Sequence, residues 1–410
     1  MANIVITTHW TDGDVLPFIK IGSELRKRGH RVTLITHCYY KNMAKSQGLD
    51  FEAWDSPEQH RQMLEDMKEE LDPLRNPCAL ERYKKKYESI EVRLREFKKV
   101  IAHCNTTDTV LVAKNRSSVA AYLAAEKLNI PLVCVFMAPS EMLSMVSYEM
   151  MLGKLLANEL NLLRKELNLA PVKSWLAWQS SPKRQIALWP DWFAEPIEEW
   201  PAEVINVGFP LSYNERFDNL PPDLMEDLLG DEAPVVITGG TSKTIRPEFY
   251  PLCVETCRLS GRKGILVTRY EELLPKELPD KVKWFRELPL NKIFPYTSAV
   301  IHHGGMGTLS GAIAAGVPQL VLPYYLDRPY NALCLKKLGI AEYLPPIKWK
   351  PEIMVDALQK ITASSFRERC KLFSKKVSLQ NTMNEICCLI EETVNNEEFL
   401  LKDISLLQTT

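Results

Sequence analysis

Short apolar runs alternate with amphipathic segments along the first half of the chain. The apolar runs lie at 3–8, 30–37, 109–114 and 130–138. Such runs are typical of strands that are buried on both faces of a parallel sheet. Residues 17–29 and 117–129 carry their apolar positions at helical spacing. The alternation of strand and helix predicts a Rossmann-like domain.

Two segments interrupt this alternation. Residues 58–103 are rich in charge and look helical, with Pro73 and Pro77 as a break. Residues 140–170 are rich in Met and Leu, and we expect them to be the least regular part of this half.

A second alternating set follows a Pro- and acid-rich stretch at 210–234. Its predicted strands are 235–240, 264–269, 282–285, 298–303 and 318–323, with helices at 247–259 and 307–315 and two or three more at about 327–395. The predicted fold class is α/β, with two Rossmann-like domains. The predicted parts are an N-terminal domain 1–210, a linker 211–234, a C-terminal domain 235–380, and a C-terminal helix and tail 381–410 that packs back towards the N-terminal domain.

The composition of the chain bears on two questions, which kind of partner it binds and in which cellular compartment it lies. A chain of 410 residues fits two domains. With 51 basic and 52 acidic residues the net charge is −1, which argues against a nucleic-acid partner. Ten scattered cysteines include no CxxC pair and no zinc pattern, and we expect them to be reduced. With no signal-peptide pattern and no apolar run of about 18 residues, we expect a cytoplasmic protein.

The stretch HHGGMGT at 302–308 carries the strongest candidate chemistry. It ends an apolar strand, and its glycines allow a tight turn and a close approach to a ligand. The following helix would begin at Met306, and its free N–H groups favour an anion such as a phosphate. The alternative is a tight connection with no ligand. The stretch fits neither GxGxxG nor the P-loop pattern.

The wider spacing resembles the nucleotide-sugar signature of family 1 glycosyltransferases. FREL (285–288), HHGGMGT, GVP (316–318) and PYYLDRPYN (323–331) occur in this order within 50 residues. GDVLPFIKIGSELRKRGHRVTLIT (13–36), VGFPL (207–211) and VVITGGTS (235–242) match further family segments, and the likeness is strongest to bacterial members that glycosylate natural products. The resemblance implies the GT-B fold, in which two Rossmann-like domains with parallel sheets face each other across a cleft.

The resemblance also implies roles for the residues of the C-terminal half. The donor is a UDP- or dTDP-sugar, with Phe285 and Leu288 flanking the base. Asp327 and the residue after it bind sugar hydroxyls. The diphosphate is cradled by Thr241, His303, Gly305, Met306, Gly307 and Thr308.

Two positions depart from the family pattern. Arg328 stands where Gln is usual, and guanidinium is a donor only. Arg328 either turns away as a surface residue or meets an oxygen-rich or acidic sugar. Gly311 stands where plant relatives hold the ribose diol with Glu, so that a deoxyribose donor such as a dTDP-sugar is not excluded.

The loop after the first strand resembles the family's catalytic segment. It places Asp14 as the general base that takes a proton from the acceptor hydroxyl. Asp14 could instead cap the following helix, and His9 and Asp12 are rival acceptor-side residues. Asp12-Gly-Asp14 also has the form of a metal motif, but we expect no metal and no cofactor. Lys114 and Asn115 stand where plant relatives have the Asp partner of a catalytic His.

The acceptor is the least defined part of the prediction. In the family, variable loops of the N-terminal domain line its pocket, and Met137 and Met142 lie in one of them; such methionines are either pocket lining or ordinary core. We expect inverting transfer to a hydroxyl of an apolar small molecule. The alternatives are a lipid or sterol glycosyltransferase at the membrane face, a nucleotide-sugar epimerase, and an inactive donor-binding partner protein.

Overall fold

The computed structural model describes residues 1–70, 77–197, 200, 204–211, 220–241, 245–394 and 396–401. The chain forms two compact units. The N-terminal unit comprises Met1–Asp191, Glu195–Val207 and the segment from Thr382 onward, and the C-terminal unit comprises Trp192–Ala194 and Gly208–Asn381. Of the predicted linker, residues 212–219 lie outside the described residues.

The N-terminal unit is built on a parallel sheet with the strand order β3-β2-β1-β4-β5-β6-β7. Its strands are β1 (Asn3–Thr7), β2 (Arg31–Thr36), β3 (Asp50–Ala53), β4 (Thr109–Lys114), β5 (Leu132–Phe136), β6 (Arg184–Ala187) and β7 (Ile205–Asn206). Its helices are α1 (Asp12–Lys27), α2 (Lys41–Ser46), α3 (Pro57–Glu70), α4 (Pro77–Tyr87), α5 (Ile90–Ala102), α6 (Val119–Leu128), α7 (Ser140–Glu166), α8 (Trp175–Gln179) and α16 (Thr382–Glu391). The strand order reverses between β1 and β4, so their carboxyl ends form the switch point where such sheets bind ligands.

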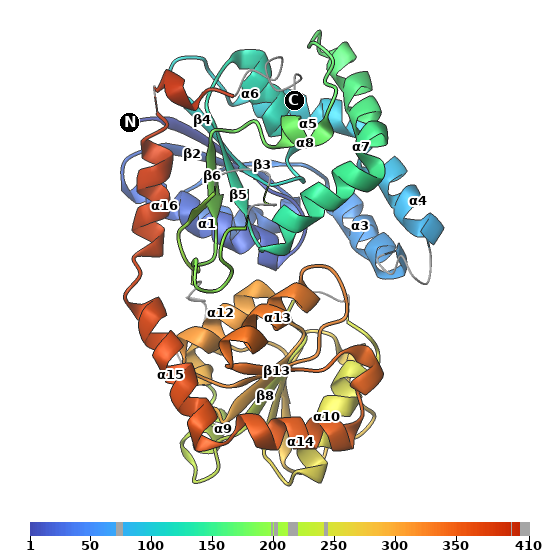
Figure 1. The fold of residues 1–410 in the computed structure, drawn as a ribbon, viewed down its shortest axis with the longest axis vertical. Coiled ribbons are helices and arrows are strands. Elements are labelled where there is room, and N and C mark those ends of the chain that lie inside the picture. Colours follow the sequence, from blue (N-terminus) through green and yellow to red (C-terminus); the bar gives the residue numbers. More distant parts are fainter. Residues whose placement is uncertain are drawn as a thin grey trace. The chain divides into compact units, whose positions relative to one another are not determined.

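Helix α16 returns the end of the chain to the N-terminal unit, where it lies beside α1 (Figure 1). Its apolar residues Ile386, Cys387 and Ile390 are buried in the same core as β1 and α1. At the rim, Glu391 accepts hydrogen bonds from Arg28 at 2.8 Å and pairs with His30 at 3.0 Å. The buried apolar face holds the helix in place, because such exposed ion pairs contribute little.

Helix α7 corrects the expectation of irregular structure at 140–170. Residues Ser140–Glu166 form one helix of 27 residues. Met142, Met145, Leu160 and Leu163 are buried along one stripe, whereas Met150 and Met151 are exposed. These exposed methionines hide the helical period in the sequence. The segment contains no proline, and its Leu, Met, Glu and Lys residues favour helix.

Helix α1 begins five residues before the predicted start at residue 17. Thr11 is its N-cap residue and Asp14 its third residue, and the Asp14 side chain accepts from the Thr11 N–H at 3.4 Å. Pro17 lies inside the helix. Asp14 is therefore part of a capping box and not the N-cap residue itself.

The C-terminal unit repeats the architecture with the strand order β10-β9-β8-β11-β12-β13. Its strands are β8 (Val235–Thr238), β9 (Gly264–Val267), β10 (Val282–Phe285), β11 (Ala299–His302), β12 (Gln319–Val321) and β13 (Ala341–Tyr343). Its helices are α9 (Pro222–Leu229), α10 (Phe249–Leu259), α11 (Leu290–Ile293), α12 (Met306–Ala314), α13 (Arg328–Leu338), α14 (Pro351–Ile361) and α15 (Ser364–Ser378). Every strand pairing in both sheets is parallel.

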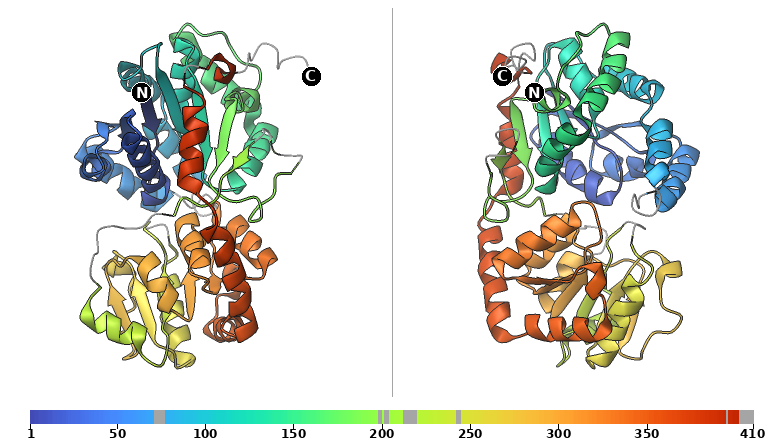
Figure 2. Two further views of the ribbon diagram at one scale, coloured as in Figure 1. Left: turned by 90° about the vertical axis from the view of Figure 1, so that its left-hand side faces the viewer. Right: turned by 45° about the vertical axis from the view of Figure 1, so that its right-hand side comes forward.

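Helices cover both faces of this second sheet (Figure 2), and a separate apolar core lies on each face. Val235 and Ile237 of β8 belong to the core under α10 and α14, and Val236 between them belongs to the core under α9 and α12. This division follows from the alternation of side chains along a strand. The two Rossmann-like sheets confirm the predicted fold class.

The end of the chain was predicted with too few elements. Among the residues described after β12, four helices, α13 to α16, are present where two or three were expected, and strand β13 lies among them. Ala341–Tyr343 is only three residues long and carries Glu342 at its centre, so its sequence gives no strand signal.

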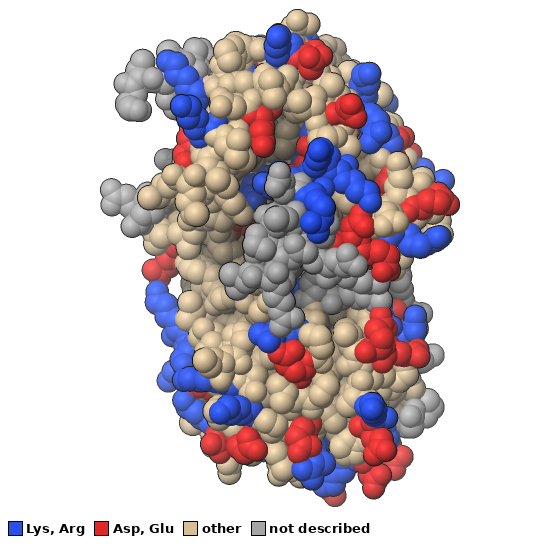
Figure 3. Space-filling view, turned by 90° about the vertical axis from the view of Figure 1, so that its right-hand side faces the viewer, with Lys and Arg blue, Asp and Glu red and all other residues tan. Residues whose placement is uncertain are grey.

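Neither charge dominates the described residues on one face of the molecule. Basic and acidic side chains lie interspersed on the face drawn in Figure 3. Among the helices described, none combines the length and the apolar character that a membrane-spanning segment requires.

Candidate active site

Two glycine turns lie side by side at the switch point of the C-terminal sheet. β8 and β11 are parallel neighbours, with Thr238 opposite His302. The turn after β8 contains Gly240 and Thr241, and the turn after β11 contains His303 to Gly305. The parallel register therefore joins the two predicted phosphate-binding turns into one surface.

The imidazole of His303 fills the space between these turns. A Cβ atom added to Gly240 would lie 2.6 Å from His303 Cε1, and one added to Gly305 would lie 2.5 Å from its Nε2. Gly240 also has a positive φ of +76°. Both positions therefore require glycine, for the close approach of the ring and, at Gly240, for the backbone as well.

His303 is buried and electrically neutral. Burial, the nearby Arg328 and His302 lower its pKa well below the ordinary range. Its Nδ1 has no hydrogen-bond partner among the residues described. A neutral imidazole has one N–H to donate, which suits a phosphate oxygen.

His302 holds the turn from inside the sheet, a role that sequence reasoning missed. Its Nδ1 accepts from the Gly304 N–H at 3.1 Å, so the proton lies on Nε2, which donates to Gln319 Oε1 at 2.9 Å. Burial lowers the pKa of His302 to about 4. The two neighbouring histidines therefore have different roles. His302 holds the backbone of the second turn, and His303 packs between the two glycine turns.

Helix α12 begins at the end of the second turn with its N-terminus open. Gly305 is the N-cap residue, and no described side chain caps this end. Met306 is half-buried, Gly307 is exposed and Thr308 is buried. The first N–H groups and the helix dipole can therefore interact favourably with an anion.

Asn331 ties this turn to the loop that holds Asp327, and sequence reasoning missed this residue as well. The fully buried Asn331 amide donates to the Gly304 carbonyl at 3.0 Å and to Asp327 Oδ2 at 2.7 Å. Leu326, just before Asp327, has a positive φ of +63°. A left-handed leucine costs about 1–2 kcal/mol, so the loop keeps a strained shape.

Arg328 corrects one of the two expectations for this position. It is only 6% exposed, so it is not a surface residue that turns away. Its guanidinium lies 5.7 Å from the Tyr325 ring centre and is close enough to lower the pKa of His303. Burial lowers its own pKa, although guanidinium remains charged at neutral pH. A buried positive charge therefore lies beside the phosphate-binding turns.

The remaining predicted donor residues lie along the same edge. Phe285 ends β10 and is half-buried, whereas Leu288 is buried in the sheet core. A Cβ on Gly311 would lie 2.5 Å from Asn291 Oδ1 and 3.3 Å from the Phe294 ring. A side chain at position 311 therefore has no room unless Asn291 moves.

In the N-terminal unit, Asp14 lies at the switch point between β1 and β4. Lys114 ends β4, and its Nζ lies 3.1 Å from Asp14 Oδ1. Oδ2 accepts from Thr11 Oγ1 at 3.3 Å. The Asp14 side chain is 28% exposed and Lys114 only 9%. Asp14 is thus held from two sides and still reaches solvent.

Glu141 completes the surroundings of Lys114. Burial lowers the pKa of the Lys114 ammonium, but the Asp14 and Glu141 carboxylates raise it by more, so the net shift is upward. Burial raises the pKa of Glu141, against the pull of Lys114. Glu141 Oε2 also accepts from the Met137 N–H at 2.8 Å.

His9 lies in a separate buried pair. Its Nε2 is 3.1 Å from Glu96 Oε1, and its ring stacks on Trp54 with centres 4.9 Å apart. Burial lowers the pKa of His9 even though Glu96 raises it. Burial raises the pKa of Glu96, but Arg93 and His9 bring it down to about 2. Glu96 therefore carries its charge in the protein interior.

The other acceptor-side candidates are buried and make contacts within the N-terminal unit. Asp12 is buried and accepts from the Tyr40 hydroxyl at 2.9 Å. Asp12 and Asp14 thus have different protein partners, which does not favour a shared metal ion. Met137 belongs to the sheet core, and Met142 is fully buried.

Comparison with known proteins agrees with this architecture. A family model for the C-terminal domain of erythromycin biosynthesis protein CIII-like proteins matches residues 264–392, and one for the glycosyltransferase family 28 N-terminal domain matches residues 4–140. O-mycaminosyltylonolide 6-deoxyallosyltransferase of Streptomyces fradiae is 24% identical, over 95% of this chain and 97% of its own. Sterol 3-beta-glucosyltransferase of Saccharomyces cerevisiae is 23% identical over 92% of this chain, which spans 34% of that longer protein.

Solved structures share the fold over nearly the full length. The glycotransferase of kitacinnamycin aligns with a TM-score of 0.72 and 18% identity, over 96% of this chain and 99% of its own. The glycosyltransferase VinC in complex with dTDP aligns with a TM-score of 0.69 and 18% identity, over 95% and 99%. The protein is a glycosyltransferase with two Rossmann-like domains. The chain belongs to the family 1 glycosyltransferases with the GT-B fold.

Proposed function

We propose that this enzyme transfers a sugar from a UDP- or dTDP-sugar to a hydroxyl of an apolar small molecule, with inversion at the anomeric carbon. The observation that carries the proposal is the paired glycine turn of the C-terminal unit, with the neutral His303 packed against Gly240 and Gly305. Helix α12 opens beside it, and Arg328 is buried there. Backbone N–H groups, one imidazole N–H and one guanidinium suit a diphosphate.

The reaction follows from these groups. Asp14 takes the proton of the acceptor hydroxyl while the hydroxyl oxygen attacks the anomeric carbon. The bond from that carbon to the diphosphate oxygen breaks, and the nucleoside diphosphate leaves with the bonding electrons. The α12 N–H groups, His303 and Arg328 stabilise the charge that develops on it. Because Asp14 and the turns belong to different units, transfer requires both units.

The donor chemistry proceeds without a metal ion. A diphosphate leaving group requires positive potential, which the α12 N-terminus and Arg328 supply. Asp327 binds sugar hydroxyls in this proposal, and Asn331 holds its carboxylate in place. The related VinC was solved in complex with dTDP, which supports a dTDP-sugar alongside a UDP-sugar. Gly311 stands where plant relatives have the Glu that holds the ribose, so a deoxyribose donor is compatible with this position.

A thermal-shift titration tests the donor site. We expect UDP or dTDP to raise the melting temperature more than GDP or ADP do, because a ligand that binds only the folded state stabilises it by mass action. EDTA should leave the shift unchanged. The preferred nucleotide, supplied as its sugar conjugate, should then give a glycosylated product with a panel of apolar alcohols and phenols. A lack of any nucleotide effect would contradict the assignment of the turns, and new sugar nucleotides formed without acceptor would identify an epimerase instead.

A sterol or other lipid acceptor at a membrane face is the second candidate. Helix α7 exposes apolar side chains, with Met150 82% and Met151 79% exposed, and Leu155 and Leu162 also reach solvent. Sterol glucosyltransferases are also among the relatives. Pelleting with sterol-containing phosphatidylcholine vesicles tests this candidate. A triple variant, Met150→Gln, Met151→Gln and Leu155→Gln, should lose pelleting, whereas the exposed Leu379→Gln of the C-terminal unit should not; equal pelleting of all forms would contradict it.

A further inference from the structure

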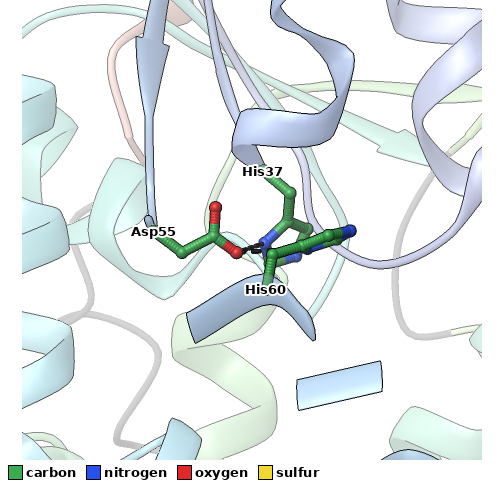
Figure 4. Close-up of side chains that lie close together, drawn as sticks. All are labelled: His37, Asp55 and His60. Atoms are coloured by element: carbon green, nitrogen blue, oxygen red, sulfur yellow. Dashed lines mark hydrogen bonds and ion pairs between the residues drawn. The ribbon is translucent and has the colours of Figure 1, made fainter. Parts of the chain in front are cut away.

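A compact cluster of metal-binding side chains lies in the N-terminal unit, apart from Asp14. His37 follows β2, Asp55 follows β3, and His60 lies in the first turns of α3 (Figure 4). Asp55 Oδ2 lies 2.7 Å from His37 Nδ1 and 3.2 Å from His60 Nδ1. One carboxylate oxygen and two imidazole nitrogens therefore converge on a single point, with all three atoms within 4.8 Å of one another.

The distances from the Asp55 oxygen to the two histidines are close to those between the ligand atoms of a tetrahedral ion. Zinc binds imidazole nitrogen and carboxylate oxygen at about 2.0–2.2 Å, which places neighbouring ligand atoms roughly 3.3 Å apart. The distance from His60 Nδ1 to Asp55 Oδ2 is 3.2 Å, close to this value, and the 2.7 Å from His37 Nδ1 to Asp55 Oδ2 must widen by about half an ångström. Calcium and magnesium are disfavoured, because they prefer sites made of oxygen.

Packing holds these ligands in place before any ion binds. Asp55 Oδ1 accepts a hydrogen bond from the Cys38 N–H at 2.8 Å, which fixes the orientation of the carboxylate group. The His37 and His60 rings lie against each other with centres 5.1 Å apart, and Tyr39 stacks on His60 at 5.8 Å. Such second contacts orient metal ligands and strengthen binding.

A small hollow lies beside the cluster and gives access to it. Its volume is about 330 Å³, and its lining is Cys38, Tyr39, Pro57, His60, Arg61 and Leu64. His37 and His60 are buried, and the Asp55 side chain is 12% exposed. The site is thus shielded but not sealed.

We propose that His37, Asp55 and His60 bind a divalent transition-metal ion of the zinc type, with a fourth position towards this hollow. The two histidines and one carboxylate match the three-ligand sites of zinc proteins. The ion would join the ends of β2 and β3 to α3. His9 lies next to the site, with its ring 5.9 Å from that of His37. The site lies on a different unit from the donor-binding turns.

Metal analysis of tag-free, full-length protein tests the proposal. After removal of metal with EDTA, we expect the protein to take up one zinc ion per chain and to melt at a higher temperature. Cobalt(II) should give the visible absorption bands of a tetrahedral nitrogen–oxygen site. The variants His60→Gln and Asp55→Asn should bind zinc at least tenfold more weakly.

A matched control separates this site from other histidines. His103 lies beside Glu52 at 3.8 Å in the same unit, and His103→Gln should bind zinc as the wild type does. Circular dichroism checks that every variant is folded. The zinc titration of the wild-type protein needs no variant, so its result remains valid even if a variant fails to fold. Less than half an equivalent of zinc in the wild type, or equal binding by a folded His60→Gln, would show that the cluster is a hydrogen-bonded clamp and overturn the proposal.

Discussion

The Lys114 Nζ atom lies 3.1 Å from Asp14 Oδ1, and this ion pair joins the carboxyl end of β4 to the first turn of α1. Lys114 is buried and Asp14 reaches solvent. The ammonium therefore holds one oxygen of the proposed base in a fixed place. Thr11 holds the other oxygen, which leaves Asp14 little freedom to turn.

The first prediction concerns the proposed base. Asp14→Asn keeps the shape of the side chain but cannot take up a proton from the acceptor. We expect kcat to fall by about 10²–10⁴-fold, the usual contribution of a general base. The Kd for UDP or dTDP, measured by calorimetry, should stay within about twofold, because the nucleotide binds to the other unit. An equal loss of transfer and of nucleotide binding would contradict the role of Asp14.

The second prediction concerns the energy of the pair. Asp14→Asn leaves the buried Lys114 ammonium with Glu141 as its remaining carboxylate, which costs stability. Replacing both residues, as Asp14→Asn with Lys114→Met, removes the stranded charge. We therefore expect the double variant to be more stable than the sum of the single changes predicts, by roughly 1–3 kcal/mol. Urea unfolding of the four proteins measures this coupling, and simple additivity would show that the pair contributes nothing.

The third prediction concerns the fit of His303 between the glycine turns. In Gly305→Ala the new methyl group would overlap the His303 ring, so the ring must move. We expect the affinity for UDP or dTDP to fall about tenfold or more, equivalent to about 1.4 kcal/mol. Gly13→Ala in the N-terminal unit is the control, because a Cβ there meets nothing within 4 Å and the residue lies outside the donor-binding turns. Similar losses in both variants would show that the loss does not come from displacing His303.

The fold and the residues of the glycine turns could be predicted from the sequence alone, because the patterns that indicate them lie within short segments of the chain. The apolar run at 235–238 and the glycines at 304 and 305 follow one another along the chain, and each has a direct physical meaning. The pairing of Asp14 with Lys114 is different, since it depends on β4 lying beside β1 in register. His37, Asp55 and His60 likewise meet only because β2 and β3 are neighbours. No spacing rule contains that information.

Arg328 shows a second limit of the sequence. Its charge suggests a surface residue, and its burial depends on the loop between β12 and α13. Asn331 fastens that loop to the Gly304 carbonyl. Only the packed loop reveals that the guanidinium lies near His303.

The fourth prediction uses this burial. Arg328→Gln restores the residue that is usual in the family but removes a positive charge from the donor site. A hydrogen bond to a charged group contributes about 1.5–3 kcal/mol, so we expect the affinity for UDP or dTDP to fall roughly 10–100-fold. The control is Arg286→Gln, whose side chain is exposed and paired with Glu271. Unchanged affinity in Arg328→Gln would contradict a contact with the diphosphate.

The last prediction concerns pH and rests on His302. Burial lowers its pKa to about 4, whereas in the unfolded chain a histidine titrates near 6.5. The unfolded state therefore binds a proton first as the pH falls, and the stabilisation present above about pH 6.5 is lost between pH 6.5 and 4. From this residue we expect the free energy of unfolding to fall by about 2 kcal/mol between pH 7 and pH 5. His9 and His303 act in the same direction, because their pKa values are also lowered.

Urea unfolding at pH 7, 6 and 5 measures this slope, and His302→Asn isolates the contribution of one residue. The asparagine oxygen can still accept from the Gly304 N–H, but Gln319 loses its partner, so the variant should already be less stable at pH 7. The comparison therefore uses the change with pH and not the stability itself. We expect the variant to lose about 2 kcal/mol less than the wild type between pH 7 and pH 5. If the unfolding free energy of the wild type and of the variant changed equally with pH, His302 would take up a proton as readily in the folded protein as in the unfolded chain. That result would contradict the prediction.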